Sequence, residues 1–190
     1  MILYLHGFRS SPQSFKARMI AEKLRALGLD ADYYCPQLPA SPREAVALAS
    51  QIARRFAPDE LTLIGSSLGG FWAYHFASRY ALKCVLLNPC MHPAATLGPY
   101  VGLVENLYTD EQGRMNRSDL LQYDKYRPVG EVECVVLHEK GDELIPYQES
   151  VANFTDKARL ILIEGGSHRF ENLELAIGEI RSLVGNQEQG

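Results

Sequence analysis

Residues 65–69, Gly-Ser-Ser-Leu-Gly, place two adjacent serines between an apolar run and a segment with helical spacing. Ser67 fits the pattern G-x-S-x-G, whereas Ser66 does not, because the residue two positions before it is Ile64. The pattern is typical of a sharp strand-to-helix turn, in which small neighbours let the backbone fold back around a strained serine. Such a turn directs N–H groups at a reacting oxygen, and Leu68 N–H is the first donor. We predict that Ser67 is a nucleophile.

A nucleophilic serine needs a base, and several histidines compete for this role. His168 lies in a glycine-rich loop after the last apolar run, where its ring can reach a site above a sheet. His75 is eight residues into the helix expected after Ser67, so we expect it to point away and to be structural. We predict His168 as the base, with His138 and His92 as the alternatives.

The base in turn needs an acid to orient it. Asp142 lies beside Gly141 in a turn after the fifth apolar run, and Glu139 and Glu143 are its rivals. Asp142 is favoured because Ser67, Asp142 and His168 then each follow a strand. This chain order, Ser-Asp-His, is the one expected with this type of turn.

Apolar runs alternate with helical segments along most of the chain. The expected strands are residues 1–6, 30–36, 60–65, 83–88, 132–138 and 158–164, and the first helix is expected to begin at Ser11 and Pro12. This alternation predicts an α/β fold with a parallel sheet covered by helices on both faces. Ligands bind at the carboxyl ends of the strands in such sheets, which is where the three candidate residues lie.

Residues 89–130, called the insertion below, interrupt this alternation. Short helices are expected around residues 102–107 and 117–122. We predict that the insertion is a small lid over an acyl pocket, with Phe8 and Trp72 in the floor; the alternative is plain scaffold at a sheet edge. The apolar residues expected to cover the site are Met91, Leu97, Tyr100, Val101, Leu103, Leu107 and Tyr108.

Composition excludes several classes of protein. The chain has 190 residues, 46% of them hydrophobic, and a net charge of −4 without any basic run, so we expect no nucleic-acid partner. The first residues lack the basic and apolar regions of a signal peptide or membrane span, so we expect a cytoplasmic protein. The four cysteines show no metal-like spacing and are expected to be reduced.

Four motifs, "LHGF", "GSSLGG", "GDELIP" and "GGSH", together resemble the α/β-hydrolase superfamily over nearly the whole chain. The opening "LYLHGFRSSP" more narrowly resembles the small bacterial YqiA/YcfP-type esterases. The resemblance implies a Ser-His-Asp hydrolase of carboxylic esters or thioesters, with Phe8 N–H beside Leu68 N–H in the oxyanion hole. His6 and Gly7 would shape that loop. Many lipases carry "HGGG" where this chain has "HGFRS", so Arg9 N–H is an alternative second donor.

The resemblance also implies the α/β-hydrolase fold with a six-stranded, mostly parallel sheet, because the two strands that precede this motif in larger relatives are missing. We expect one domain over residues 1–185 with the lid-like insertion, and a frayed tail at residues 186–190. The expected partner is a small acyl ester or thioester, with no metal or organic cofactor. An acyltransferase, a non-catalytic binding protein on the same fold and a metal-dependent hydrolase remain alternatives.

Overall fold

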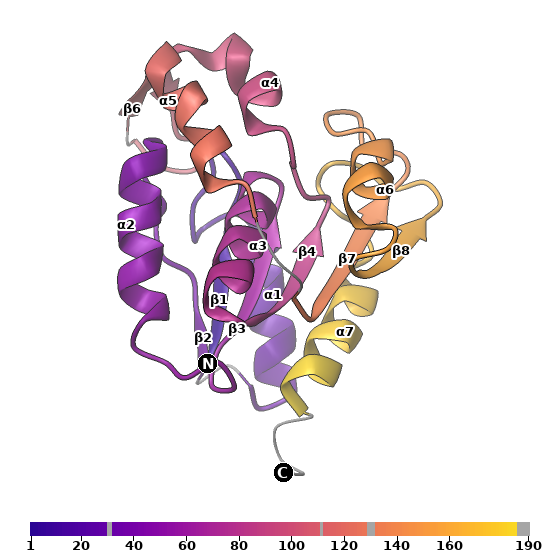
Figure 1. Ribbon diagram of the computed structural model, residues 1–190. Helices are drawn as coiled ribbons and strands as arrows, with labels where there is room; N and C mark the ends of the chain where they lie inside the picture. Colours follow the sequence, from indigo (N-terminus) through magenta and orange to yellow (C-terminus); the bar gives the residue numbers. More distant parts are fainter. Residues whose placement is uncertain (30–31, 111, 129–131, 186–190) are drawn as a thin grey trace.

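The central sheet has six parallel strands in the order β2-β1-β3-β4-β7-β8 (Figure 1). The computed structural model describes residues 1–29, 32–110, 112–128 and 132–185. The strands are β1 (Ile2–Leu5), β2 (Tyr33–Tyr34), β3 (Thr62–Ser66), β4 (Lys83–Leu87), β7 (Cys134–Glu139) and β8 (Arg159–Ile163). The expected six-stranded parallel sheet is confirmed.

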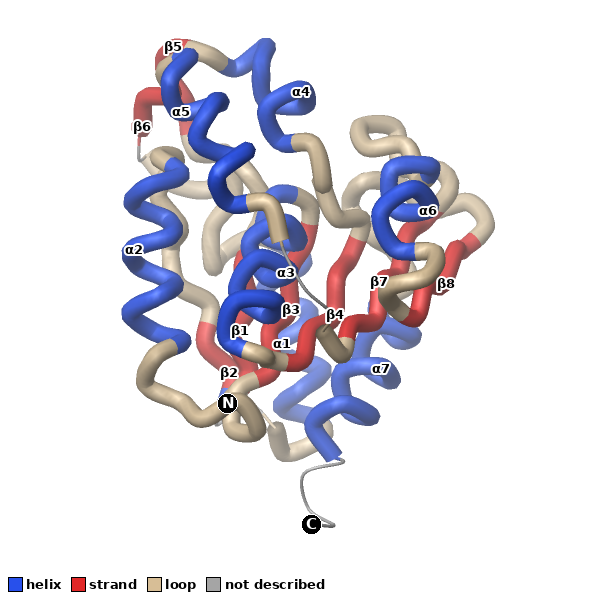
Figure 2. The backbone as a smooth tube through the Cα atoms, in the orientation of Figure 1, coloured by secondary structure: helices blue, strands red, loops and turns tan. Residues whose placement is uncertain are grey.

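Helices cover both faces of this sheet (Figure 2). Helices α1 (Phe15–Ala26) and α7 (Leu173–Gly185) cover one face, and α2 (Pro42–Ala53), α3 (Leu68–Tyr80) and α6 (Gln148–Phe154) cover the other. Successive strand residues point to opposite faces. In β1, Ile2 and Tyr4 therefore join the core beneath α1 and α7, whereas Leu3 and Leu5 join the core beneath α2 and α3.

The strand order reverses direction between β1 and β3. The chain passes from β1 to the edge strand β2, then returns to β3 and continues through β4 and β7 to the other edge, β8. Because all the strands are parallel, the loops that follow them meet at one edge of the sheet. Ligands of open α/β sheets bind at such a point of reversal, and Ser67 directly follows β3.

The first helix begins later than the sequence indicated. Helix α1 starts at Phe15, and its N-cap is Ser14, whose Oγ accepts the N–H of Ala17 at 3.4 Å. The prediction of a start at Ser11 was wrong because the Ser11 hydroxyl accepts the N–H of Gln13 at 3.0 Å in a separate turn. The loop before α1 is correspondingly longer.

The insertion lies beyond the carboxyl ends of the strands, at the end of the molecule away from Met1 (Figure 1). It contains α4 (Pro93–Leu97), the 3-10 turn η2 (Gly98–Tyr100), β5 (Gly102–Glu105), β6 (Gln112–Met115), α5 (Arg117–Gln122) and the 3-10 turn η3 (Tyr123–Tyr126). The helix expected at residues 117–122 is present.

The prediction of a helix at residues 102–107 was wrong, because β5 and β6 form an antiparallel hairpin there. Every second residue of β5 faces the core: Val104 is 5% exposed, whereas its neighbour Leu103 is 66% exposed. This alternation is the period of a strand.

All four cysteines are free, as expected, and Cys84 and Cys134 are neighbours on β4 and β7. Among the described residues no helix is long and apolar enough to cross a membrane. The tail expected at residues 186–190 lies outside the described residues.

Candidate active site

Ser67 occupies the turn between β3 and α3 with φ 55° and ψ −124°. Positive φ is unfavourable for a residue with a side chain, so the surrounding structure must hold this conformation. Two glycines make the turn possible. A Cβ atom at Gly65 would overlap the backbone of Gly69, and one at Gly69 would overlap the carbonyl group of Leu5. Larger residues at either position would force the turn open.

The hydroxyl groups of the two adjacent serines have different partners. Ser66 is the last residue of β3, is buried, and its Oγ accepts a hydrogen bond from Lys16 of α1. Ser67 instead places its Oγ 3.1 Å from Nε2 of His168. Only the second arrangement pairs a serine with a base.

The other ring nitrogen of His168 faces Asp142. Nδ1 lies 2.8 Å from Oδ2 and 3.0 Å from Oδ1 of this carboxylate. The carboxylate accepts a hydrogen bond from Nδ1–H and so keeps the ring proton on Nδ1, which leaves the lone pair on Nε2 free to accept the proton of Ser67. The structure therefore brings Ser67, His168 and Asp142 together in one hydrogen-bonded chain.

Asp142 is itself held by its own turn. Its Oδ1 accepts the N–H of Leu144 at 2.9 Å and the N–H of Ile145 at 2.8 Å. Burial acts to raise the pKa of Asp142, but the hydrogen bonds from His168, Ile145 and Leu144 outweigh it and hold the pKa below its usual value. The side chain is thus kept as a carboxylate opposite the imidazole.

The competing histidines make other contacts, although His138 Nε2 also lies 3.8 Å from Oδ2 of Asp142. His138 is fully buried, with Nδ1 2.7 Å from Oγ of Ser150 and Nε2 3.0 Å from the carbonyl oxygen of Ile145. His75 is buried among aromatic rings of α3, as expected for a structural residue. His92 is the N-cap residue of α4.

The rival acids support the loop of His168 rather than its ring. Glu139 is fully buried; its Oε2 accepts the N–H of Ser167, and its Oε1 accepts the N–H groups of Glu171 and Asn172 and the side-chain amide of Asn172, all at 2.7–2.8 Å. Glu143 accepts the N–H of His168 itself at 3.0 Å. Sequence reasoning missed this role of Glu139, although a carboxylate directly after the expected fifth strand was the available signal.

Asn88 joins this loop to the end of β4. Its Nδ2 donates to the carbonyl oxygen of Ser167 at 3.0 Å, and its Oδ1 accepts the N–H of Glu139 at 2.9 Å. Asn88 has φ 44°, a conformation that asparagine adopts more readily than most residues. Asn88 and Glu139 therefore fix the residue directly before His168 from two sides.

The loop after β1 lies against the Ser67 turn. His6 is buried and accepts the N–H of Leu38 at Nε2, 3.0 Å, while Nδ1 donates to the carbonyl oxygen of Gly7, 2.9 Å. Burial lowers the pKa of His6, which favours the neutral ring that this pattern requires. His6 thus shapes the loop, as expected.

Three backbone N–H groups lie near Ser67. Those of Phe8, Arg9 and Leu68 have no protein acceptor within the described parts of the chain. Leu68 is the first residue of α3, so its N–H is left unpaired by the helix itself. These are the donors that the sequence analysis named for an oxyanion hole, and the choice between Phe8 and Arg9 stays open.

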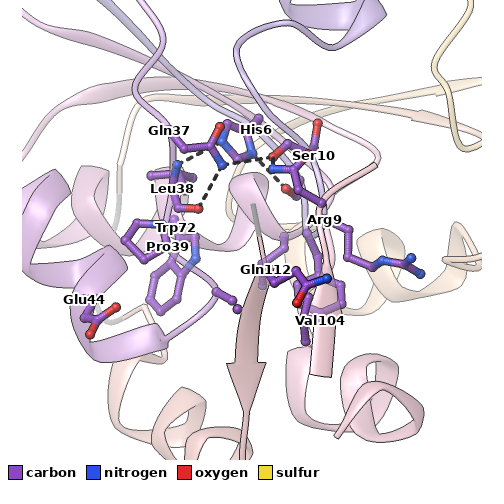
Figure 3. Close-up of a pocket in the computed structure, with 16 residues that line it drawn as sticks. His6, Arg9, Ser10, Gln37, Leu38, Pro39, Glu44, Trp72, Val104 and Gln112 are labelled. Carbon is purple, nitrogen blue, oxygen red and sulfur yellow. Dashed lines mark hydrogen bonds between the residues drawn. The ribbon is translucent and has the colours of Figure 1, made fainter. Parts of the chain in front are cut away.

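Two cavities flank the loop of residues 7–10, which lines both. The first, of about 270 Å³, contains Ser67 and His168 and is also lined by Lys16, Leu107 and Tyr108. The second, of about 440 Å³, is lined by Leu68, Trp72 and Val104 together with polar side chains such as Gln37 and Glu44 (Figure 3). Each cavity thus reaches one side of the candidate site.

The insertion is fastened to the loop between the cavities. Arg9 Nε donates to the carbonyl oxygen of Glu105, Leu107 N–H donates to the carbonyl oxygen of Arg9, and Asn106 Nδ2 donates to the carbonyl oxygen of Ser10, each at 2.9 Å. The rings of Phe8 and Tyr100 also meet edge to face, 5.4 Å apart.

Not every residue expected to cover the site does so. Of the expected residues, Leu107 and Tyr108 line the smaller cavity, whereas Leu103 is exposed and lines neither. Val104, which the sequence analysis did not name, lines the larger cavity. Met91 and Leu97 are buried in the core that also contains Phe71 of α3. The insertion therefore combines a packed inner part with a rim beside Ser67. Among the described residues, no cluster of His, Cys, Asp or Glu is placed to hold a metal ion.

The chain matches the model of a family described as "Uncharacterised protein family (UPF0227)" over residues 1–185. A UPF0227 protein of Vibrio cholerae is 23% identical to it over 182 residues, which cover 91% of this chain and 93% of the relative. The narrower resemblance to YqiA/YcfP-type esterases is consistent with this match.

Solved structures establish the fold. Mouse alpha/beta hydrolase domain-containing protein 10 superposes with a TM-score of 0.75 at 18% identity, covering 97% of this chain and 89% of that one. Est1E from Butyrivibrio proteoclasticus with ferulic acid bound superposes with a TM-score of 0.71 at 16% identity, covering 100% and 89%. The predicted α/β-hydrolase fold is confirmed.

Proposed function

This chain belongs to the UPF0227 family and has the α/β-hydrolase fold, and we propose that it is a serine hydrolase that cleaves carboxylic esters or thioesters. The observation that carries the proposal is the hydrogen-bonded chain from Ser67 through His168 to Asp142, with Ser67 on a strained turn beside unpaired N–H groups. This combination is what acyl transfer to serine requires.

In the first half of the reaction, Ser67 Oγ attacks the acyl carbonyl carbon while His168 Nε2 takes the hydroxyl proton. Asp142 stabilises the imidazolium that forms and holds its orientation. The N–H of Leu68, with that of Phe8 or Arg9, binds the oxyanion of the tetrahedral intermediate. His168 then gives the proton to the leaving oxygen or sulfur, and the acyl group remains on Ser67.

In the second half, water takes the place of the leaving group. His168 removes a proton from water as the water attacks the acyl carbonyl, and returns that proton to Ser67 as the acid departs. All the proton transfers pass through one ring nitrogen, Nε2. The arrangement therefore supports hydrolysis without any additional acid or base.

The acyl group and the leaving group are assigned to different cavities. Leu68 lines the larger cavity together with Trp72 and Val104, and Phe8 lines both cavities, so a carbonyl oxygen held by the Leu68 N–H would place the acyl chain against apolar side chains of the larger cavity. His168 lines the smaller cavity, and it must reach the leaving atom. We therefore assign the leaving group to the smaller cavity.

Labelling with a fluorophosphonate probe tests the nucleophile, and hydrolysis of 4-nitrophenyl butyrate tests the activity. Ser67→Ala is expected to abolish labelling and to lower kcat by roughly 10⁴ or more. Ser66→Ala is the matched control and should still be labelled. Labelling that persists in Ser67→Ala would assign the chemistry to another residue. Product analysis with an added alcohol would show whether the acyl group passes to water or to the alcohol.

A further inference from the structure

Positively charged side chains gather around the cavity that contains Ser67 and His168. Lys16, Arg169 and Arg9 all line it, and Glu143 is the one acidic residue among its described lining residues. The chain as a whole carries a net charge of −4. The excess of positive charge is thus local to this cavity.

None of these three cations is neutralised by a carboxylate within ion-pair distance in the described part of the chain. Lys16 Nζ donates to Ser66 Oγ and, at 3.4 Å, to the carbonyl oxygen of His168. The guanidinium of Arg169 lies 5.3 Å from the ring centroid of Phe15, on an exposed part of the rim.

Other cationic side chains of the protein do form ion pairs with carboxylates. Lys23 of α1 forms an ion pair with Glu174, and Arg159 forms one with Glu179. Glu143, the acid beside the cavity, already accepts the N–H of His168. The cavity therefore offers cationic groups that form no ion pair with a carboxylate within the described residues.

Lys16 is the best placed of the three cations. It is only partly exposed, and its two acceptors are a serine hydroxyl and a carbonyl oxygen on either side of the Ser67–His168 pair. Burial lowers its pKa to about 8, although the charges of Asp142 and Glu139 act to raise it. At neutral pH the ammonium form therefore predominates.

We propose, building on the hydrolase function above, that the natural leaving group is an alcohol or thiol with an anionic substituent, a carboxylate or phosphate, which Lys16 and Arg169 bind. The smaller cavity is the leaving-group side because His168 must protonate the leaving atom there. An anion in this cavity would meet an ammonium group near the reacting atoms and a guanidinium at the rim. Both are groups that bind carboxylates and phosphates.

Matched esters isolate the effect of the charge. Methyl 4-butyryloxybenzoate is neutral, 4-butyryloxybenzoate carries a carboxylate on the same ring, and 4-butyryloxyphenyl phosphate carries a phosphate. The measured quantity is the ratio of kcat/KM for each anionic ester to kcat/KM for the neutral ester. A substitution that changes the transfer of the shared butyryl group by the same factor for all three esters leaves this ratio unchanged.

Lys16→Met is expected to lower this ratio about tenfold, the size typical of one charge-assisted hydrogen bond. Lys16→Arg keeps the charge and should retain most of the ratio. Arg169→Met, on the exposed rim, should lower the ratio by a smaller factor. Lys23→Met is the matched control on the same helix, outside this cavity, and should leave the ratio unchanged. The larger ratio of the two anionic esters identifies the preferred anion.

A second measurement needs no variant. In the wild-type protein, kcat/KM for the anionic esters should fall as NaCl is raised, while that for the neutral ester stays constant, because salt screens the attraction. Equal ratios in wild type, Lys16→Met and Arg169→Met, with no dependence on salt, would overturn this inference while the hydrolase function stood. Failure of the wild type to hydrolyse any of the three esters would overturn both.

Discussion

The carboxylate of Glu139, at the end of β7, accepts the backbone N–H of Ser167, the residue directly before His168. The same carboxylate also holds Glu171 and Asn172, so one buried side chain fixes both ends of the loop that carries the proposed base. Rigid support of this kind matters because small displacements of a reacting group cost large factors in rate. Glu139 is thus a positioning residue for His168.

Glu139→Gln should lower both stability and kcat. The amide would set an N–H₂ group against backbone donors, so we expect a loss of about 3 kcal/mol in the free energy of unfolding. Well below Tm, kcat should still fall while KM changes little, because the loop of His168 is misplaced. Glu143→Gln is the matched control, since it removes the negative charge from a side chain that makes one contact to the same loop. A full kcat in Glu139→Gln would show that His168 does not depend on this support.

Asp142→Asn tests the proposed orientation of the imidazole. The amide cannot hold a proton on Nδ1 as a carboxylate does, so kcat should fall by roughly 10³–10⁴ with the fold retained. Steady-state kinetics with 4-nitrophenyl butyrate and a thermal unfolding curve separate the two effects. Near-normal kcat would assign the orienting role to another acid.

The same variant should change how stability depends on pH. The pKa of Asp142 is lowered in the folded protein, so its charge stabilises the fold above the unfolded pKa of about 3.9. This contribution is lost as the pH falls through the folded pKa. The difference in free energy of unfolding between wild type and Asp142→Asn should therefore shrink between pH 7 and acidic pH. A difference that stays constant would mean that the folded pKa is not lowered.

Val104→Phe should shift the preference among acyl chains. Val104 lines the larger cavity, and a phenyl ring there would occupy the space assigned to the chain. We expect kcat/KM for an octanoyl ester to fall about tenfold relative to an acetyl ester, within the range known for crowded apolar pockets. Leu103→Phe adds the same ring one residue away, on the exposed side of β5, and should leave the profile unchanged. Equal changes in both variants would indicate that the acyl chain lies elsewhere.

Gly69→Ala should be strongly destabilising, by more than about 3 kcal/mol, because the new methyl group would overlap the carbonyl of Leu5. Gly178→Ala, in the interior of α7, meets nothing within 4 Å and should instead stabilise by about 0.5–1 kcal/mol. Urea unfolding followed by the fluorescence of Trp72 measures both. Similar stabilities would show that the Ser67 turn can relax around a larger residue.

Much of the site could be predicted because the sequence signals were local. The glycines around Ser67 and the strand that precedes it indicated the turn, and the parallel sheet required Ser67, Asp142 and His168 to share one edge. The chain order then distinguished Asp142 from Glu139 and Glu143, and the structure places Asp142 at the ring of His168.

The features that could not be predicted depend on contacts between segments that are distant in the sequence. The start of α1 depended on which serine was already used by a turn. The β5–β6 hairpin depended on Val104 and Met115 meeting a core to which α2 and α3 contribute. Lys16 was not identified because helical spacing does not tell which residue will reach the end of a strand in the next layer. These contacts are set by packing, which a single sequence does not display.

Because β8 lies at the edge of the sheet, we expect activity to be lost before the core unfolds. Within the described residues β8 pairs only with β7 and is partly exposed, whereas β3, which leads to Ser67, is central and fully buried. Proteins open locally at their least protected segments before they unfold as a whole. A brief opening of β8 would loosen the strand side of the loop that carries His168, whose other contacts are to Glu139 and Asn88, while the serine turn and its N–H donors stayed in place. Heat inactivation would then precede the loss of the native fluorescence of Trp72, and hydrogen exchange would be faster in β8 than in β3.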